Sequence, residues 1–152
     1  EKDRLRIDKK KLAKHKVKGK LVGDLVKGKN VKVDGKIVKF KDVTYLEKGR
    51  KVSFVFDTKL NNNVGKLVKN SDLAIMEGVF LGSTEKGKEM SKRYKHLTIE
   101  DTCNAAKKGK VKELIISHIS QRYEFKEKLL LREAKKIFKN VKIAKDLMKV
   151  SL

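Results

Sequence analysis

The sequence predicts an α/β fold in which short strands alternate with helices, preceded by a basic extended arm. Three apolar runs, KVSFVFD, SDLAIM and KELIISH, are each followed by a glycine or a polar loop and then by a helical stretch. Alternation of this kind gives a layered structure whose functional groups lie at the carboxyl ends of the strands. We therefore expect an arm over residues 1–30 and a strand-and-helix region over residues 31–152.

The amino-terminal segment is the most densely basic part of the chain. Residues 1–50 hold 18 basic and 7 acidic residues, and glycines interrupt a weak helical spacing of apolar residues before residue 30. We expect this segment to bury little and to be extended. The following run, VKVDGKIV, places two alternating segments around Asp34-Gly35, which predicts a β-hairpin.

The later elements have clearer boundaries. NNNVGKLVKN and EFKEKLLLREAKKIF are expected helices, and VKIA and LMKV are expected short strands. TIEDTCNAAKKG predicts a helix with Thr98 as its N-cap and Gly109 just past its end. Cys103 lies on the apolar face of that helix, so we interpret it as a core residue and not as a catalytic thiol.

Composition restricts the class of function. Lys and Arg number 41 against 19 Asp and Glu, a formal net charge of +22, which suits a polyanion such as nucleic acid, although a compositional bias toward lysine would look the same. No apolar run is long enough to cross a bilayer, so we expect no membrane partner. A single cysteine without a CxxC pair excludes a zinc finger and indicates a reducing compartment, so we expect a cytoplasmic protein.

Four titratable residues stand at positions where chemistry is expected. Asp57, Glu77 and His118 each end an apolar run, and His96 lies just before the Thr98 cap. Each has a plainer interpretation: Asp57 as the cap of the next helix, Glu77 as a solvated carboxylate and the histidines as structural residues.

Arg122 and Tyr123 follow His118 within five positions. A guanidinium fork matches phosphate oxygens, so the segment HISQRY is a candidate phosphate or substrate site.

Taken in order, these segments resemble the carboxyl-terminal half of ribonuclease Z, the tRNA 3′-end-processing endoribonuclease of the metallo-β-lactamase superfamily. SHISQRY is similar to the closing metal motif of that family, and His96-Leu-Thr to its His-Ser-Thr segment. FVFDT resembles the strand that ends in a metal-bridging aspartate, and IMEGVF resembles the His-Glu-Ala-Thr segment. The basic amino-terminal segment resembles the tRNA-clasping arm, the exosite.

The resemblance implies a fold, an activity and a set of roles. The fold would be about half of a four-layer sandwich, and the activity would be hydrolysis of a tRNA precursor with two zinc ions. Asp57 and His118 would bind metal, His96 would act in catalysis with Glu77 holding its other ring nitrogen, and Arg122 and Tyr123 would support the loop or contact phosphate. The implied RNA-binding residues of the arm are Arg4, Arg6, Lys9, Lys10, Lys11, Lys18 and Lys20.

The chain also departs from the family pattern. Met76 stands at the usual first histidine of the His-Glu-Ala-Thr segment, Phe56 replaces a glycine, and the HxHxDH metal motif is absent. With three histidines and a first residue that is not Met, we expect an incomplete site that needs a complementary amino-terminal half, and an isolated chain that is inactive.

An isolated half would also expose apolar strand edges, so we expect it to pair with that half or with itself as a homo-oligomer. Two alternatives remain open: a non-catalytic RNA-binding remnant, and half of a phosphodiesterase for small phosphodiesters.

Overall fold

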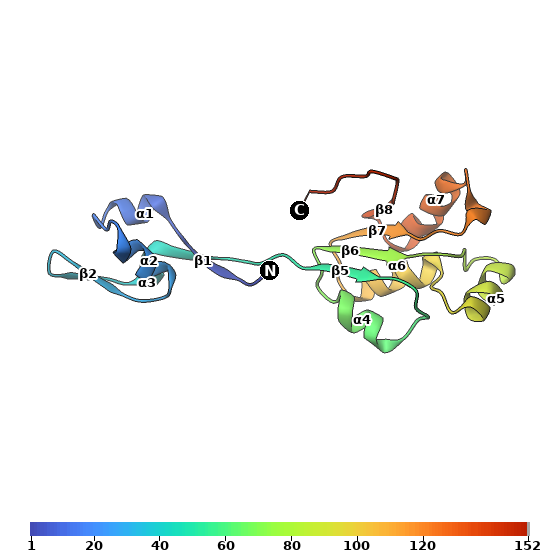
Figure 1. Ribbon diagram of the computed structural model, residues 1–152, viewed down its shortest axis with the longest axis horizontal. Coiled ribbons are helices and arrows are strands. Elements are labelled where there is room, and N and C mark those ends of the chain that lie inside the picture. The colour runs from blue at the N-terminus through green and yellow to red at the C-terminus, as the bar shows by residue number, and fades with distance from the viewer. Residues whose placement is uncertain (152) are drawn as a thin grey trace. The chain divides into compact units, whose positions relative to one another are not determined.

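The computed structural model describes residues 1–151 and divides the chain into two compact units (Figure 1). The first unit is Glu1–Arg50, and the second begins at Lys51. The division falls after Arg50, whereas the predicted basic arm ends at residue 30. The twenty residues between these positions pack with the amino-terminal segment, as their core shows.

The first unit contains two small antiparallel sheets and three short helices. β1 pairs with β4, and β2 pairs with β3 in the hairpin that the sequence predicts. Asp34 and Gly35 both have positive φ, 49° and 77°, as a two-residue hairpin turn requires. The elements are β1 (Arg4–Ile7), α1 (Lys9–Ala13), α2 (Lys20–Val26), β2 (Val31–Val33), β3 (Lys36–Val38), α3 (Phe40–Val43) and β4 (Thr44–Glu47).

The amino-terminal segment is folded and not continuously extended. Leu25 is fully buried, and Val17 is buried beside it in a small apolar core. The other core residues, Val31, Val38 and Val43, come from the twenty residues that follow. The first 30 residues therefore bury little by themselves but acquire a core from the segment that follows the predicted boundary.

The second unit is built on a four-stranded parallel sheet in the order β5-β6-β7-β8. This confirms the predicted α/β class and the strands in KVSFVFD, SDLAIM, KELIISH and VKIA. The elements are β5 (Val52–Val55), α4 (Asn62–Val68), β6 (Leu73–Glu77), α5 (Glu85–Tyr94), α6 (Ile99–Lys108), β7 (Glu113–Ser117), the 3-10 helix η1 (Gln121–Tyr123), α7 (Glu127–Ile137) and β8 (Val141–Ile143).

The expected last strand in LMKV does not form. Residues 147–150 have no strand, and Leu147 is 96% exposed with a left-handed φ of 60°. A strand needs a neighbour for its backbone groups, and this segment has none in the described chain.

One face of the parallel sheet carries the main core. Helix α6 packs on β6 and β7, and α7 packs on β8. The sheet residues of this core alternate along each strand, as period-two side-chain placement requires. They are Val55, Ala74, Met76, Leu114, Ile116, Val141 and Ile143.

Helix α6 follows its sequence prediction closely. Thr98 is its N-cap in a complete capping box with Asp101, Gly109 is its C-cap, and Cys103 is buried in the core. This helix start fixes the backbone immediately after His96. Within the described residues, no helix combines the length and apolar character needed to cross a bilayer.

Candidate active site

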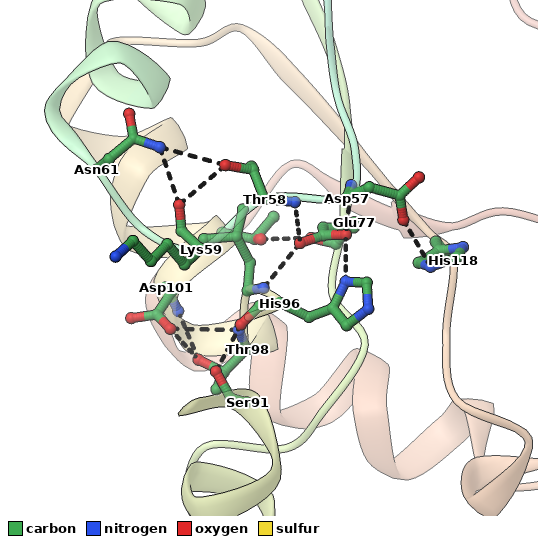
Figure 2. Close-up of polar contacts among 12 residues, drawn as sticks. Asp57, Thr58, Lys59, Asn61, Glu77, Ser91, His96, Thr98, Asp101 and His118 are labelled. Carbon is green, nitrogen blue, oxygen red and sulfur yellow. Dashed lines mark hydrogen bonds and ion pairs between the residues drawn. The ribbon is translucent and has the colours of Figure 1, made fainter. Parts of the chain in front are cut away.

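Four titratable side chains converge at the carboxyl edge of the sheet. Asp57 follows β5, Glu77 ends β6, His96 precedes α6, and His118 follows β7. One ligand atom from each lies within 4.8 Å of those of the other three, and Figure 2 shows them facing one another. The parallel register explains this convergence, because Glu77 pairs with Ser117 and Val55 with Met76, so the three strands end together.

Glu77 is the buried centre of this cluster. Its side chain has no exposure, and its Oε2 accepts the Asp57 N–H at 2.8 Å while its Oε1 accepts the Leu97 N–H at 2.8 Å. The Thr58 N–H donates to Oε1 at 3.3 Å, and His96 Nδ1 lies 3.0 Å from Oε2 (Figure 2). Donors of this kind compensate a buried carboxylate for lost hydration. Glu77 therefore joins the end of β6 to the segment after β5 and to the segment before α6, and it is not a solvated residue.

His96 is held from both its ring and its backbone. With Nδ1 donating to the Glu77 carboxylate, the proton is fixed on Nδ1 and Nε2 is left as the acceptor or proton-carrying atom. The Ser91 hydroxyl donates to the His96 carbonyl, and the His96 N–H donates to the Ser91 carbonyl. The His96 side chain is 22% exposed, so it is partly accessible to solvent.

Asp57 and His118 form the exposed side of the cluster. His118 Nε2 lies 3.3 Å from Asp57 Oδ1, and their side chains are 48% and 74% exposed, respectively. Both residues have left-handed backbones, with φ of 50° for Asp57 and 52° for His118. Such conformations are unfavourable for residues other than glycine and cluster at functional sites. Asp57 is not a helix cap, because Asn61 caps α4.

The donor set suits a divalent metal such as zinc, but only in part. Asp57, His118 and His96 offer a carboxylate oxygen and imidazole nitrogens, which are zinc ligands in proteins. Both Glu77 oxygens already accept N–H groups, so Glu77 is better suited to orienting His96 than to binding metal. Even if all three bound metal, they would be too few to complete two separate ligand sets.

Arg122 and Tyr123 make their contacts outside the cluster. The Leu81 N–H donates to the Tyr123 hydroxyl at 3.0 Å, and Arg122 contacts the Met90 sulfur on α5. These contacts join η1 to the loop after β6 and to α5. The roles that the resemblance implies for Arg122 and Tyr123, support of the loop or contact with phosphate, stay predictions.

Several supporting residues were not found from the sequence. Glu100 accepts the Gly82 and Ser83 N–H groups at 2.6 and 2.8 Å, and the Thr102 hydroxyl donates to the Glu77 carbonyl. The spacing Thr98-x-x-Asp101 is a capping pattern and could have identified Asp101. No local pattern marks Glu100 or Thr102, since their partners lie on another loop or strand.

Comparison with known proteins identifies the relatives of this chain. No protein-family model matches it. It is 33% identical over 148 residues to ribonuclease Z of Protochlamydia amoebophila, covering 97% of the chain and 47% of that protein. It is 41% identical over 116 residues to ribonuclease Z of Listeria welshimeri, covering 75% of the chain and 37% of that protein.

Two solved structures have similar folds. The metallo-β-lactamase fold protein YhfI from Bacillus subtilis matches with a TM-score of 0.53 and 22% identity, covering 67% of this chain and 40% of that one. The short form of human tRNase Z matches with a TM-score of 0.50 and 25% identity, covering 76% of this chain and 36% of that one.

The parallel sheet with its polar cluster therefore belongs to the metallo-β-lactamase fold class. Within that class the chain is a homologue of ribonuclease Z over nearly its whole length. It spans less than half the length of the curated relatives it matches.

Proposed function

We propose that this chain is one part of a tRNA 3′-end-processing endoribonuclease and that a complementary segment completes its active site. The observation that carries the proposal is the convergence of Asp57, Glu77, His96 and His118 in a homologue of ribonuclease Z. The substrate would be a tRNA precursor, processed in the cytoplasm, and the reaction would be hydrolysis of a phosphodiester.

Asp57 and His118 are the proposed metal ligands. Both are accessible, they lie beside each other, and among residues 1–151 no backbone N–H donates to either side chain as it does to Glu77. Two zinc ions, when bound, would supply Lewis acidity and a hydrolytic nucleophile at neutral pH. Asp57 follows β5 and His118 follows β7, so both side chains lie at the carboxyl ends of strands and are accessible to solvent.

His96 is the proposed acid-base residue, and Glu77 is its positioning residue. Because Glu77 fixes Nδ1, the Nε2 atom is the one that can give a proton to the leaving oxygen or stabilise charge on the phosphate. Burial of the Glu77 carboxylate keeps this orientation from being lost to water.

The complementary segment is proposed because the described site is short of ligands. The whole sequence has three histidines, and one of them, His15, belongs to the first unit. The relatives are more than twice as long as the stretch they share with this chain. The segment would be the rest of a longer protein or a separate chain, and without it the chain would be inactive and prone to associate with itself.

The first unit is the proposed contact surface for tRNA. The seven basic residues that the resemblance singled out are all exposed, and three of them, Lys9, Lys10 and Lys11, follow one another in α1. Arg6 is paired with Glu47, whose carboxylate raises the pKa of the Arg6 guanidinium, so Arg6 would contribute less free charge than its neighbours. Arg122 retains a proposed phosphate role beside its contact with Met90.

The test measures zinc content and nuclease activity on matched variants. The chain alone, dialysed against zinc, should bind it weakly and cleave no precursor tRNA. Combined with the remainder of Protochlamydia amoebophila ribonuclease Z that this chain does not match, it should gain cleavage. In that complex His118→Ala should lower both zinc content and cleavage, His96→Ala should lower cleavage alone, and His15→Ala should change neither.

The outcomes separate the alternatives. Two tightly held zinc ions and cleavage by the chain alone would contradict the need for a complementary segment. A complex that binds tRNA but does not cleave would favour a non-catalytic remnant. A complex that cleaves only a small phosphodiester would indicate a phosphodiesterase instead.

A further inference from the structure

The two histidines of the cluster lie in the middle of a series of five flat rings. His96 and His118 have ring centroids 5.4 Å apart. Phe80 lies 6.4 Å from His96, and Tyr94 lies 6.3 Å from Phe80 at an interplanar angle of 32°. On the other side, Phe56 meets His118 edge-on at 6.5 Å and 83°.

The rings at the two ends of this series face solvent. Tyr94 is 50% exposed and Phe56 is 40% exposed, whereas Phe80 between Tyr94 and His96 is 5% exposed. Scattered exposed apolar residues are ordinary, but these two end a continuous series that contains both imidazoles of the site. Exposed aromatic faces beside a reactive cluster are suited to stacking with another flat group.

Tyr94 already carries one flat cationic group. The Arg93 guanidinium lies over its ring, with the carbon 5.5 Å from the centroid, and Arg93 is exposed. A nucleobase presents a flat face of the same kind, and a displaced guanidinium can pair with a neighbouring phosphate. An aromatic ring beside a free guanidinium is thus a place where one nucleotide can be held by both its base and its phosphate.

We propose that Phe56 and Tyr94 are stacking platforms for unpaired nucleobases of the RNA that enters the site, and so hold the nucleotides that flank the reacting phosphate. The inference rests on the proposed function, because it assumes that the cluster acts on RNA. Single-stranded RNA is commonly held by bases stacked on aromatic side chains, with a basic surface following the backbone. The excess of basic over acidic residues in this chain suits a polyanionic ligand such as RNA.

Phe54, on β5, provides a matched control. It lies two residues before Phe56 and is more exposed, at 60%, so its replacement removes at least as much accessible aromatic surface. Its ring has no contact with the imidazoles of the cluster among the described residues. A general affinity of apolar surface for RNA would therefore affect Phe54 as much as Phe56.

The experiment compares two fluorescent RNA hexamers of equal charge, one with all its bases and one fully abasic, binding to the full 152-residue chain. Both hexamers make the same contacts between lysine and phosphate, so the ratio of their two affinities measures the contribution of the bases. Phe56→Leu and Tyr94→Leu should each weaken binding of the normal hexamer roughly fivefold, the lower end for one stacked base, and leave the abasic hexamer unchanged. Phe54→Leu should change neither.

Conservative variants keep the result interpretable if a leucine variant is poorly folded. Phe56→Tyr and Tyr94→Phe retain the rings and should retain the preference for the hexamer with bases. Equal losses on both hexamers, or equal losses in Phe54→Leu, would overturn the proposal.

The assay needs no cleavage, so the two proposals can fail separately. A base-dependent result with an inactive complemented enzyme would contradict only the proposed function. A base-independent result with an active enzyme would contradict only the stacking platforms.

Discussion

The two units carry the same net charge on very different lengths of chain. Residues 1–50 have 18 basic and 7 acidic residues, and the remaining 102 have 23 basic and 12 acidic, so each part has a net charge of +11. The first unit has five buried apolar residues, whereas the buried polar side chains of the described residues, including the Glu77 carboxylate, all belong to the second. No buried polar side chain is described in the first unit, whereas in the second unit a buried carboxylate, that of Glu77, organises the candidate site.

This difference has a physical consequence for how each unit should respond to change. Exposed lysines act on a polyanion through counterion release, which depends on salt and on charge number more than on exact position. A buried carboxylate that accepts several hydrogen bonds depends on the exact positions of its donors. Removing the carboxylate leaves each of these donors without an acceptor. Replacing exposed lysines of the first unit should therefore affect binding, whereas replacing the buried Glu77 of the second unit should affect folding.

The largest expected effect follows from Glu77→Ala. Removing the carboxylate leaves buried N–H donors without acceptors and should lower the free energy of unfolding by about 3–5 kcal/mol. Urea titration measures the loss, and hydrogen exchange should show reduced protection in residues 51–151 only. Leu25→Ala, in the core of the first unit, should give the reciprocal pattern.

Glu85→Ala is the matched control, because Glu85 is an exposed carboxylate whose pKa is lowered by its pairing with Lys88. Its unfolding midpoint should stay nearly unchanged. Loss of protection in both units from Glu77→Ala would show that the two units unfold together and do not respond separately to mutation.

A smaller effect is expected from neutralising three lysines of α1. Replacing Lys9, Lys10 and Lys11 by Gln should weaken binding of a tRNA transcript and reduce the slope of log affinity against log salt by roughly 0.7–0.9 for each phosphate that is no longer neutralised. The measurement is a salt titration by fluorescence anisotropy. The same replacement at Lys107, Lys108 and Lys110, around the end of α6, removes equal charge from the second unit.

If both triple variants reduce the slope equally, charge attracts tRNA without regard to its location. The first unit would then not be a dedicated RNA surface. If neither variant changes the slope, the lysines reflect a compositional bias and not a binding surface.

The smallest effect is expected from alkylation of the Cys103 thiol in the folded chain. Burial raises the pKa of its thiol to about 12 from an ordinary value of 9.0, so at pH 8 only about one part in ten thousand is the reactive thiolate. Iodoacetamide should label the native chain very slowly and the urea-unfolded chain rapidly, as mass spectrometry can follow. Because deprotonation activates the thiol, labelling should become faster as the pH rises toward 12.

Cys103 also reports on opening of the second unit alone. Leu25→Ala should leave its labelling rate unchanged, and Glu77→Ala should raise it. Rapid labelling of the unaltered chain at pH 8 would contradict a buried core cysteine.

Local patterns in the sequence determined the elements that depend on local physics. Thr98 and Gly109 bracket α6, Asp34-Gly35 closes the hairpin, and three apolar runs predict three strands. The sequence alone also places Asp57, Glu77 and His118 at the ends of these runs, where an α/β fold carries its functional groups. Capping, turn geometry and side-chain alternation are constraints between residues that are near in sequence, which is why they can be read from it.

Only the tertiary structure decided which distant segments contact Glu77 and which residues form the core of the first unit. The donors to Glu77 come from Asp57, Thr58, His96 and Leu97, about twenty residues to either side, and they meet it because of the strand register. The first unit is folded because Leu25 finds Val31, Val38 and Val43 across its core, which no spacing within residues 1–30 could show. Burial and multiple hydrogen bonding depend on which distant segments pack together, and that information is set by the whole fold.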